Sequence, residues 1–189
     1  IHYLTKKEIE KKYKYIKIDK ENKKIISFIL GGPNKYYDFS NDQVNIIFNK
    51  VKNLFTPDKY KIVVIPSYRT PEDIIKKAFN TFSHNHIVFK EVNKNAYLSS
   101  LSMSDFIVIT CDSTSMISEA AVTGKPIYVA NMIPTKNNKR FKFFYEQFKK
   151  LGIIKDLEDS IDIWSYNQLD EVNRIAPIIK DKMKSNGII

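Results

Sequence analysis

From Lys24 onward, short apolar runs alternate with longer segments in which apolar residues recur at helical spacing. Most of the short runs are apolar without interruption, as is typical of parallel strands covered on both faces. The predicted strands are Ile25–Leu30, Ile62–Ile65, Ile87–Phe89, Phe106–Thr110 and Ile127–Ala130. The predicted helices between and after them are Asp42–Phe55, Pro71–Phe82, Ala96–Met103 and Ser113–Thr123. This alternation predicts an α/β fold, with a Rossmann-like parallel sheet flanked by helices.

Local signals mark several helix ends. Thr70 is the expected N-cap of the second helix, with Pro71 at its first position, and Gly124 is the expected C-cap of the fourth. Two more helices, Arg140–Leu151 and Gln168–Lys184, follow the sheet, the first of them ended by Gly152.

The chain is expected to have three parts. Residues 1–23 form a lead-in from an N-terminal domain that the given sequence lacks, as a start at Ile1 rather than Met suggests. Residues 24–151 form a Rossmann-like nucleotide-binding domain, and residues 152–189 form a helical extension that packs on it.

Composition narrows the class of protein. The 189 residues, 43% of them hydrophobic, are enough for one domain with a proper core. Cys111 is the single cysteine, and His2, His84 and His86 show no metal-ligand spacing, so neither a disulfide scaffold nor a metal site is predicted. No apolar run approaches the roughly 18–20 residues of a membrane span. A cytoplasmic location fits best.

The formal net charge of +10 raises the question of a polyanionic partner. Lysines are scattered along the whole chain and arginine occurs only as Arg69, Arg140 and Arg174, so binding of nucleic acid, which needs a basic face or stripe, is not favoured. Attraction to an anionic membrane, on its inner face, stays open because five lysines gather near the start of the chain. They are Lys6, Lys7, Lys11, Lys12 and Lys14.

Ligands of open parallel sheets bind outside the carboxyl ends of the strands, so the loops that follow the strands are the candidate site. After the first strand, Gly31 and Gly32 allow the backbone to approach a ligand closely, although two glycines also suit a plain tight turn. This loop matches neither the G-x-G-x-x-G fingerprint nor a P-loop. After the second strand, Ser67, Arg69 and Thr70 offer hydroxyls, a guanidinium and a helix start, which suit a phosphate. A capped helix with an exposed arginine is the alternative.

The loop after the fourth strand is the most informative. Ser113, Thr114, Ser115 and Met116 begin a helix whose first amides can bind an anion, and Glu119 follows about one and a half turns later, within reach of a ribose. Asp112 is expected to cap this helix. Taken singly, each of these residues also fits an ordinary helix start or a solvated helix position.

Together the loops resemble the nucleotide-binding segment of GT-B glycosyltransferases, and more closely the family named for mitochondrial fission in plants, which has many bacterial members. The resemblance extends from the first lysine-rich stretch to about Leu151. It is carried by Phe28–Lys35, Ser67–Glu72, Asn95–Leu98, Thr110–Pro126 and Arg140–Phe141. This sequence departs from the family at Ala96, where proline is common, and at Tyr68, where a second basic residue is common.

The resemblance implies a role for each matching position. Glu119 would hold the ribose hydroxyls, while Ser113, Ser115 and the helix amides, helped by Gly32 and Arg69, would hold the diphosphate. The base would lie around Val92–Tyr97, and the loop Asn131–Arg140 would face the donor sugar or the missing domain.

The implied activity is a metal-independent glycosyl transfer from a UDP-sugar or related sugar nucleotide to an envelope or lipid-type acceptor, with no other cofactor. The acceptor pocket and the catalytic base would come from the missing domain, so no catalytic residue is predicted and this chain alone is expected to be inactive. The alternative is a non-catalytic adaptor of the same fold that acts through protein partners at a membrane.

Overall fold

A computed structural model describes residues 4–13, 15–18 and 22–188, so that His2 and Lys14, named above, lie outside the described part. Its centre is a six-stranded parallel sheet with strand order β3-β2-β1-β4-β5-β6. The strands are β1 (Lys24–Leu30), β2 (Tyr60–Pro66), β3 (Ile87–Val88), β4 (Phe106–Thr110), β5 (Ile127–Ala130) and β6 (Ile154–Asp156). The Rossmann-like fold and the five predicted strands are confirmed, and β6 is a sixth strand that was not predicted.

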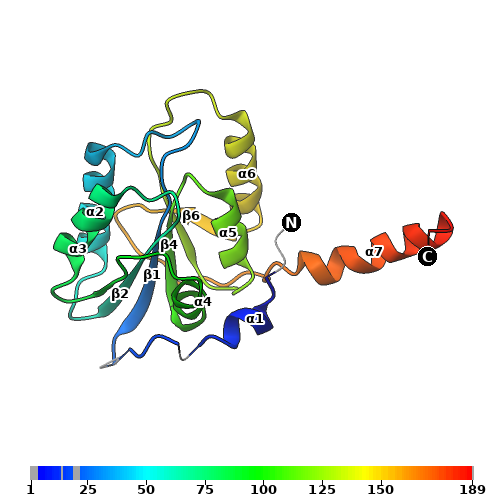
Figure 1. The fold of residues 1–189 in the computed structure, drawn as a ribbon, viewed down its shortest axis with the longest axis horizontal. Coiled ribbons are helices and arrows are strands. Elements are labelled where there is room, and N and C mark those ends of the chain that lie inside the picture. The colour runs from blue at the N-terminus through cyan, green and yellow to red at the C-terminus, as the bar shows by residue number, and fades with distance from the viewer. Residues whose placement is uncertain (1–3, 14, 19–21, 189) are drawn as a thin grey trace.

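Helices cover both faces of the sheet, with α2 and α3 on one side and α4 and α5 on the other (Figure 1). The helices are α1 (Lys6–Glu10), α2 (Asn41–Leu54), α3 (Glu72–Phe82), α4 (Lys94–Met103), α5 (Thr114–Ala121), α6 (Lys139–Lys150) and α7 (Glu171–Ser185). All six predicted helices are present, with ends that differ by a few residues, and α1 was not predicted.

Alternate residues of β1 point to opposite layers. Phe28 packs edge-on against Phe48 of α2 and Phe82 of α3, with ring centroids 5.8 and 5.9 Å away. On the other face, the hydroxyl of Ser27 lies 2.8 Å from that of Ser100 on α4. Two small residues at this contact bring α4 close to the sheet, so the helix and its preceding loop are held over the ends of β1 and β2.

The strand order places three loops next to one another. Strand β1 lies between β2 and β4, with Leu30 in register with Pro66 and Ile29 in register with Ile109. The segments that leave these three strands at their carboxyl ends therefore meet at one point of the sheet edge. These are the loops in which the sequence predicted the ligand site.

The predicted caps at the start of α3 and at the end of α5 differ from the structure. Helix α3 begins at Glu72 with Pro71 as N-cap, so the assignment of Thr70 as N-cap was wrong. The Thr70 hydroxyl instead donates to the carbonyl oxygens of Leu30 (3.0 Å) and Gly31 (2.6 Å), because the end of β1 lies beside it. The C-cap of α5 is Val122 rather than Gly124, which follows in the left-handed region at φ +72°.

The segments outside the predicted nucleotide domain pack to different extents. Helix α1 lies against α4, and the amide of Ile16 donates to the Ser99 hydroxyl at 3.1 Å. After α6, Ile153, Ile154 and Leu157 are buried. Helix α7, in contrast, projects from the body (Figure 1), and none of its described side chains is buried. Within the described residues, no helix is both long enough and apolar enough to cross a bilayer.

Candidate nucleotide site

A cavity of about 270 Å³ opens at the sheet edge where the loops meet. It lies between the end of β2, the segment that leads into α4, and the side of α5. Its lining residues are Leu4, Ile29, Pro66, Ser67, Tyr68, Val92, Asn93, Lys94, Tyr97, Leu98, Met116 and Glu119. The wall is largely apolar with a few polar groups, which is the usual character of a small-molecule site.

The polar centre of this wall is a pair formed by Tyr97 of α4 and Glu119 of α5. The Tyr97 hydroxyl donates to Oε2 of Glu119 at 2.7 Å. Burial raises the pKa of Tyr97 well above its usual value, and the neighbouring Glu119 carboxylate raises it further, so the phenol stays protonated as a donor. The bond holds the carboxylate at the cavity and leaves Oε1 for a ligand hydroxyl.

Helix α4 is placed at the cavity by its own cap. Oδ1 of Asn93 accepts from the amide of Ala96 at 2.9 Å, which starts the helix just before Tyr97. The predicted base region Val92–Tyr97 therefore contributes four lining residues, Val92, Asn93, Lys94 and Tyr97.

The start of α5 is capped by Ser113, whose Oγ accepts from the amide of Met116 at 3.4 Å. The prediction that Asp112 caps this helix was therefore wrong. Thr114 and Ser115 form the first turn, where backbone amides have no intrahelical acceptors and favour an anion. This turn comes directly before Met116 and Glu119 on the same helix, but its own side chains are not among those that line the cavity.

Asp112 is the centre of a clamp that joins the three loops. Its side chain is completely buried, and Oδ2 accepts from Arg69 Nη2 at 2.7 Å and from the amide of Gly32 at 3.0 Å. Oδ1 accepts from the Thr110 hydroxyl at 2.7 Å, and that hydroxyl accepts in turn from the amide of Gly31 at 2.8 Å. A buried carboxylate with this many donors is a structural centre, because each donor offsets part of its desolvation.

This clamp uses donors that the sequence analysis assigned to a phosphate. The amides of Gly31 and Gly32 are both occupied within the protein, and Arg69 also donates from Nη1 to the carbonyl of Gly32 at 2.7 Å. A Cβ at position 31 would overlap the Asp112 carboxylate, and one at position 32 would overlap the backbone of Arg69. Both positions therefore need glycine for close packing of the loops themselves.

The predicted residues thus divide into two groups. Those that line the cavity are Ser67, Tyr97, Met116 and Glu119. Those that lie beside it, in the clamp or at the start of α5, are Gly31, Gly32, Arg69, Thr70, Ser113, Thr114 and Ser115. Their roles toward a nucleotide stay predictions.

Sequence reasoning missed five lining residues of the cavity, and it missed Asp112 as the centre of the clamp. The five are Leu4, Ile29, Pro66, Tyr68 and Leu98. Leu4 gives no local signal, because only the folding of α1 against α4 brings it there. Asp112 could have been found from the strand order, which places the end of β4 beside the Gly-Gly loop after β1. In the described part of the chain, no three His, Cys, Asp or Glu side chains gather as metal ligands do.

A parallel sheet of this strand order, with an apolar cavity and a capped helix start at its carboxyl edge, defines a Rossmann-like domain with a candidate nucleotide site. The chain belongs to the mitochondrial fission ELM1 family, whose sequence model matches residues 1–183. The expected family is confirmed.

Two relatives are longer than this chain and match it over part of their length. It is 31% identical over 188 residues to the uncharacterized protein RP120 of Rickettsia prowazekii, covering 95% of this chain and 51% of that protein. It is 30% identical over 126 residues to the mitochondrial fission protein ELM1 of Arabidopsis thaliana, covering 64% of this chain and 29% of that protein. The chain therefore spans about half the length of the Rickettsia relative and less of the plant one.

Solved structures show fainter likenesses. The UDP-GlcNAc 2-epimerase of Neisseria meningitidis, bound to UDP-GlcNAc, aligns with a TM-score of 0.47 and 15% identity over 97% of this chain and 42% of that one. The wall teichoic acid polymerase TagF aligns with a TM-score of 0.42 and 15% identity over 66% of this chain and 28% of that one. The strand order of the sheet defines the fold, and we base no argument on structural similarities with TM-scores this low.

Proposed function

We propose that this chain is the sugar-nucleotide-binding half of a GT-B-type glycosyltransferase. The observation that carries the proposal is the Tyr97–Glu119 pair, which presents a fixed carboxylate at the cavity about one turn after the first backbone amides of α5. A carboxylate accepts from the two hydroxyls of a ribose, and a helix start binds the adjoining diphosphate. The apolar part of the cavity, around Val92 and Leu98, would hold the base.

Transfer would leave a nucleoside diphosphate, and the negative charge that develops on it would be stabilised by the α5 amides, which are already oriented. Arg69 would act mainly as a positioning residue, because its guanidinium holds the loops through Asp112. Its remaining N–H groups could still contact an outer phosphate oxygen. The acceptor pocket and the catalytic base would belong to the rest of the full-length protein.

Calorimetric titration of UDP into the wild type and three variants tests the proposal. Glu119→Ala removes bonds to both ribose hydroxyls and should weaken binding by roughly 2–3 kcal/mol, about 30- to 160-fold. Glu119→Gln retains one acceptor oxygen and should lose less. Tyr97→Phe frees the carboxylate without removing it and should weaken binding about threefold to tenfold.

The matched control is Glu72→Ala, which removes an exposed carboxylate from α3, outside the cavity, and should leave UDP affinity unchanged. Thermal melts separate lost binding from lost folding, since Glu119→Ala also leaves the Tyr97 hydroxyl without its acceptor. Unchanged affinity in Glu119→Ala would refute the ribose assignment. No UDP binding by the wild type would favour the adaptor alternative.

A further inference from the structure

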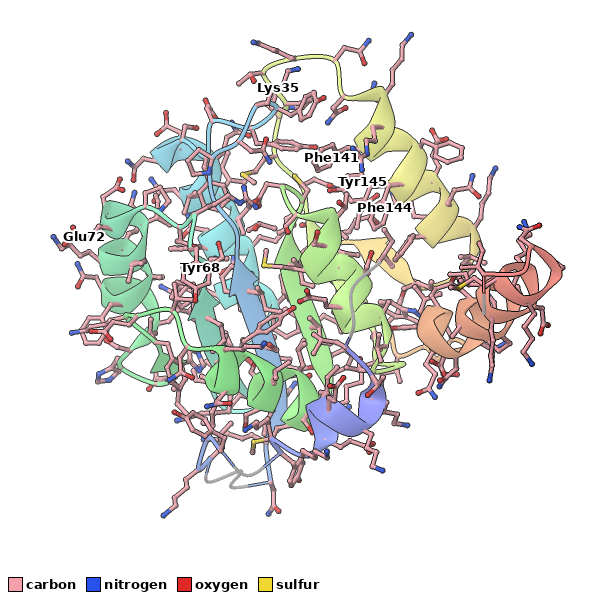
Figure 2. All side chains as sticks on the ribbon, turned by 45° about the vertical axis from the view of Figure 1, so that its right-hand side comes forward. Lys35, Tyr68, Glu72, Phe141, Phe144 and Tyr145 are labelled. Carbon is pink, nitrogen blue, oxygen red and sulfur yellow. The ribbon has the colours of Figure 1, made fainter. Side chains whose placement is uncertain are left out.

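Helix α6 carries aromatic residues on both of its sides, although only one side packs on the domain. Phe141, Phe144 and Tyr145 point from α6 toward the sheet and α5 (Figure 2). Phe143 lies on the opposite side and is 64% exposed. Because most of the Phe143 ring is exposed to water, its burial contributes little to the stability of this fold.

The outward side of α6 and the loop before it are strongly basic. Their cations are Lys136, Lys139, Arg140 and Lys142, all exposed. No Asp or Glu occurs between Glu119 and Glu146, and within the described residues none of the four has a carboxylate at ion-pair distance. Glu146 is the one acidic residue on this side of the helix, so the surface stays positive.

The loop also holds a second apolar side chain in solvent. Ile133 is 76% exposed, yet its amide donates to Oε1 of Gln43 at 2.5 Å. Two residues later, the amide of Thr135 donates to the carbonyl of Tyr36 at 2.8 Å. Because the loop backbone is tied on both sides of Pro134, Ile133 is held outward by the structure.

We propose that this α6 surface, formed by Ile133, Lys136, Lys139, Arg140, Lys142 and Phe143, docks on an anionic lipid bilayer. The cations attract anionic headgroups, and Phe143 and Ile133 enter the interface between headgroups and acyl chains. The same cations would also attract the phosphates of a nucleic acid, but the aliphatic Ile133 side chain cannot stack on a base. The exposed aliphatic and aromatic pair therefore favours the bilayer. None of these six residues lines the candidate nucleotide cavity. Docking on a bilayer would replace the role toward the donor sugar or the missing domain that the resemblance implied for the loop Asn131–Arg140.

Sedimentation of the chain with lipid vesicles tests the proposal. We expect binding to vesicles of phosphatidylcholine mixed with phosphatidylglycerol, little binding to phosphatidylcholine alone, and weaker binding as salt is raised. Each cation near such a surface contributes about fivefold in affinity, so Lys139→Ala/Arg140→Ala should bind roughly 25-fold more weakly. Phe143→Ser should weaken vesicle binding without changing the affinity for a DNA duplex.

The matched control is Lys180→Ala/Lys182→Ala, which removes the same net charge from exposed positions of α7. Affinity for the mixed vesicles should stay within about twofold of the wild type. Equal losses in the two double variants would show that only net charge matters and would overturn the assignment to α6. Failure of the wild type to bind the mixed vesicles, or tight duplex binding with no effect of Phe143→Ser on vesicles, would overturn it as well. None of these outcomes bears on UDP binding.

Discussion

The ion pair between Arg69 and Asp112 leads us to expect that Asp112→Asn has opposite effects on stability in the wild type and in the Arg69→Ala variant. Arg69→Ala removes the cation and leaves the Asp112 carboxylate, which is completely buried, without its charged partner. Asp112→Asn removes the charge but keeps the shape. Asp112→Asn should therefore lower the free energy of unfolding of the wild type and raise that of the Arg69→Ala variant.

The magnitudes follow from the donors that remain. Breaking a buried ion pair from one side typically costs about 3–5 kcal/mol. Here Gly32 and Thr110 still donate to the carboxylate, and the Arg69 side chain is 40% exposed, so we expect about 2–4 kcal/mol for Arg69→Ala. Asp112→Asn should cost only about 1–2 kcal/mol. Its amide nitrogen can face the Thr110 hydroxyl while its oxygen still accepts from Gly32 and Arg69.

Urea unfolding of the wild type, both single variants and the double variant measures the coupling. The single tryptophan, Trp164, whose indole N–H donates to the carbonyl of Gly152 at 2.8 Å, reports the transition by fluorescence. Asp112→Asn should raise the stability of the Arg69→Ala protein by about 1 kcal/mol, because it removes the uncompensated charge. Equal losses from Asp112→Asn in both backgrounds would refute the reasoning.

Two further predictions concern titrating groups. Burial lowers the pKa of His86 from 6.5 to about 4, and its Nδ1 accepts from the amide of Ile62, so its stabilisation is complete above about pH 6.5 and is lost as the pH falls toward 4. Between pH 7 and pH 5 the free energy of unfolding should fall by no more than about 2 kcal/mol, and His86→Asn should abolish this fall. The same pH dependence in the variant would exclude His86 as its source. Burial raises the pKa of the Cys111 thiol to about 11. Iodoacetamide at about pH 8 should therefore alkylate Cys111 much more slowly in the native protein than in urea, and similar rates would contradict its burial.

The sheet could be predicted because its strands have a strong local signal. Strands β1, β2 and β4 are almost entirely apolar, and Phe106–Thr110 was predicted with the bounds that the structure shows. Strand β6 has only three residues, of which Ile154 alone is buried, so its place is decided by pairing with β5 rather than by its own sequence. Helix α1, in contrast, does have a local signal that the sequence analysis overlooked, because Thr5 and Glu8 form a capping box at its start. With only five residues it also packs against α4.

Caps were harder to predict because neighbouring residues have equal local preference. Asp112 and Ser113 are both good N-cap residues, and sequence alone does not choose between them. The choice is made by the end of β1, where Gly32 and, from the next loop, Arg69 take the Asp112 carboxylate and leave Ser113 to cap α5. A tertiary contact also decides the role of Thr70, because its hydroxyl donates to the carbonyls of Leu30 and Gly31 at the end of β1 and does not cap α3.

The same competition decides which predicted groups remain for a ligand. The glycines, Arg69 and Thr70 were assigned to a phosphate because each carries donors at the correct sheet edge. In the folded chain most of these donors bind within the three loops, because buried polar groups need hydrogen-bond partners inside the protein. Under the proposed function, a phosphate would use the first turn of α5 and a ribose would use Glu119, which Tyr97 holds in place. A sequence motif at the edge of a parallel sheet therefore includes both the residues that would bind and those that hold them, and only the packing of neighbouring loops separates the two.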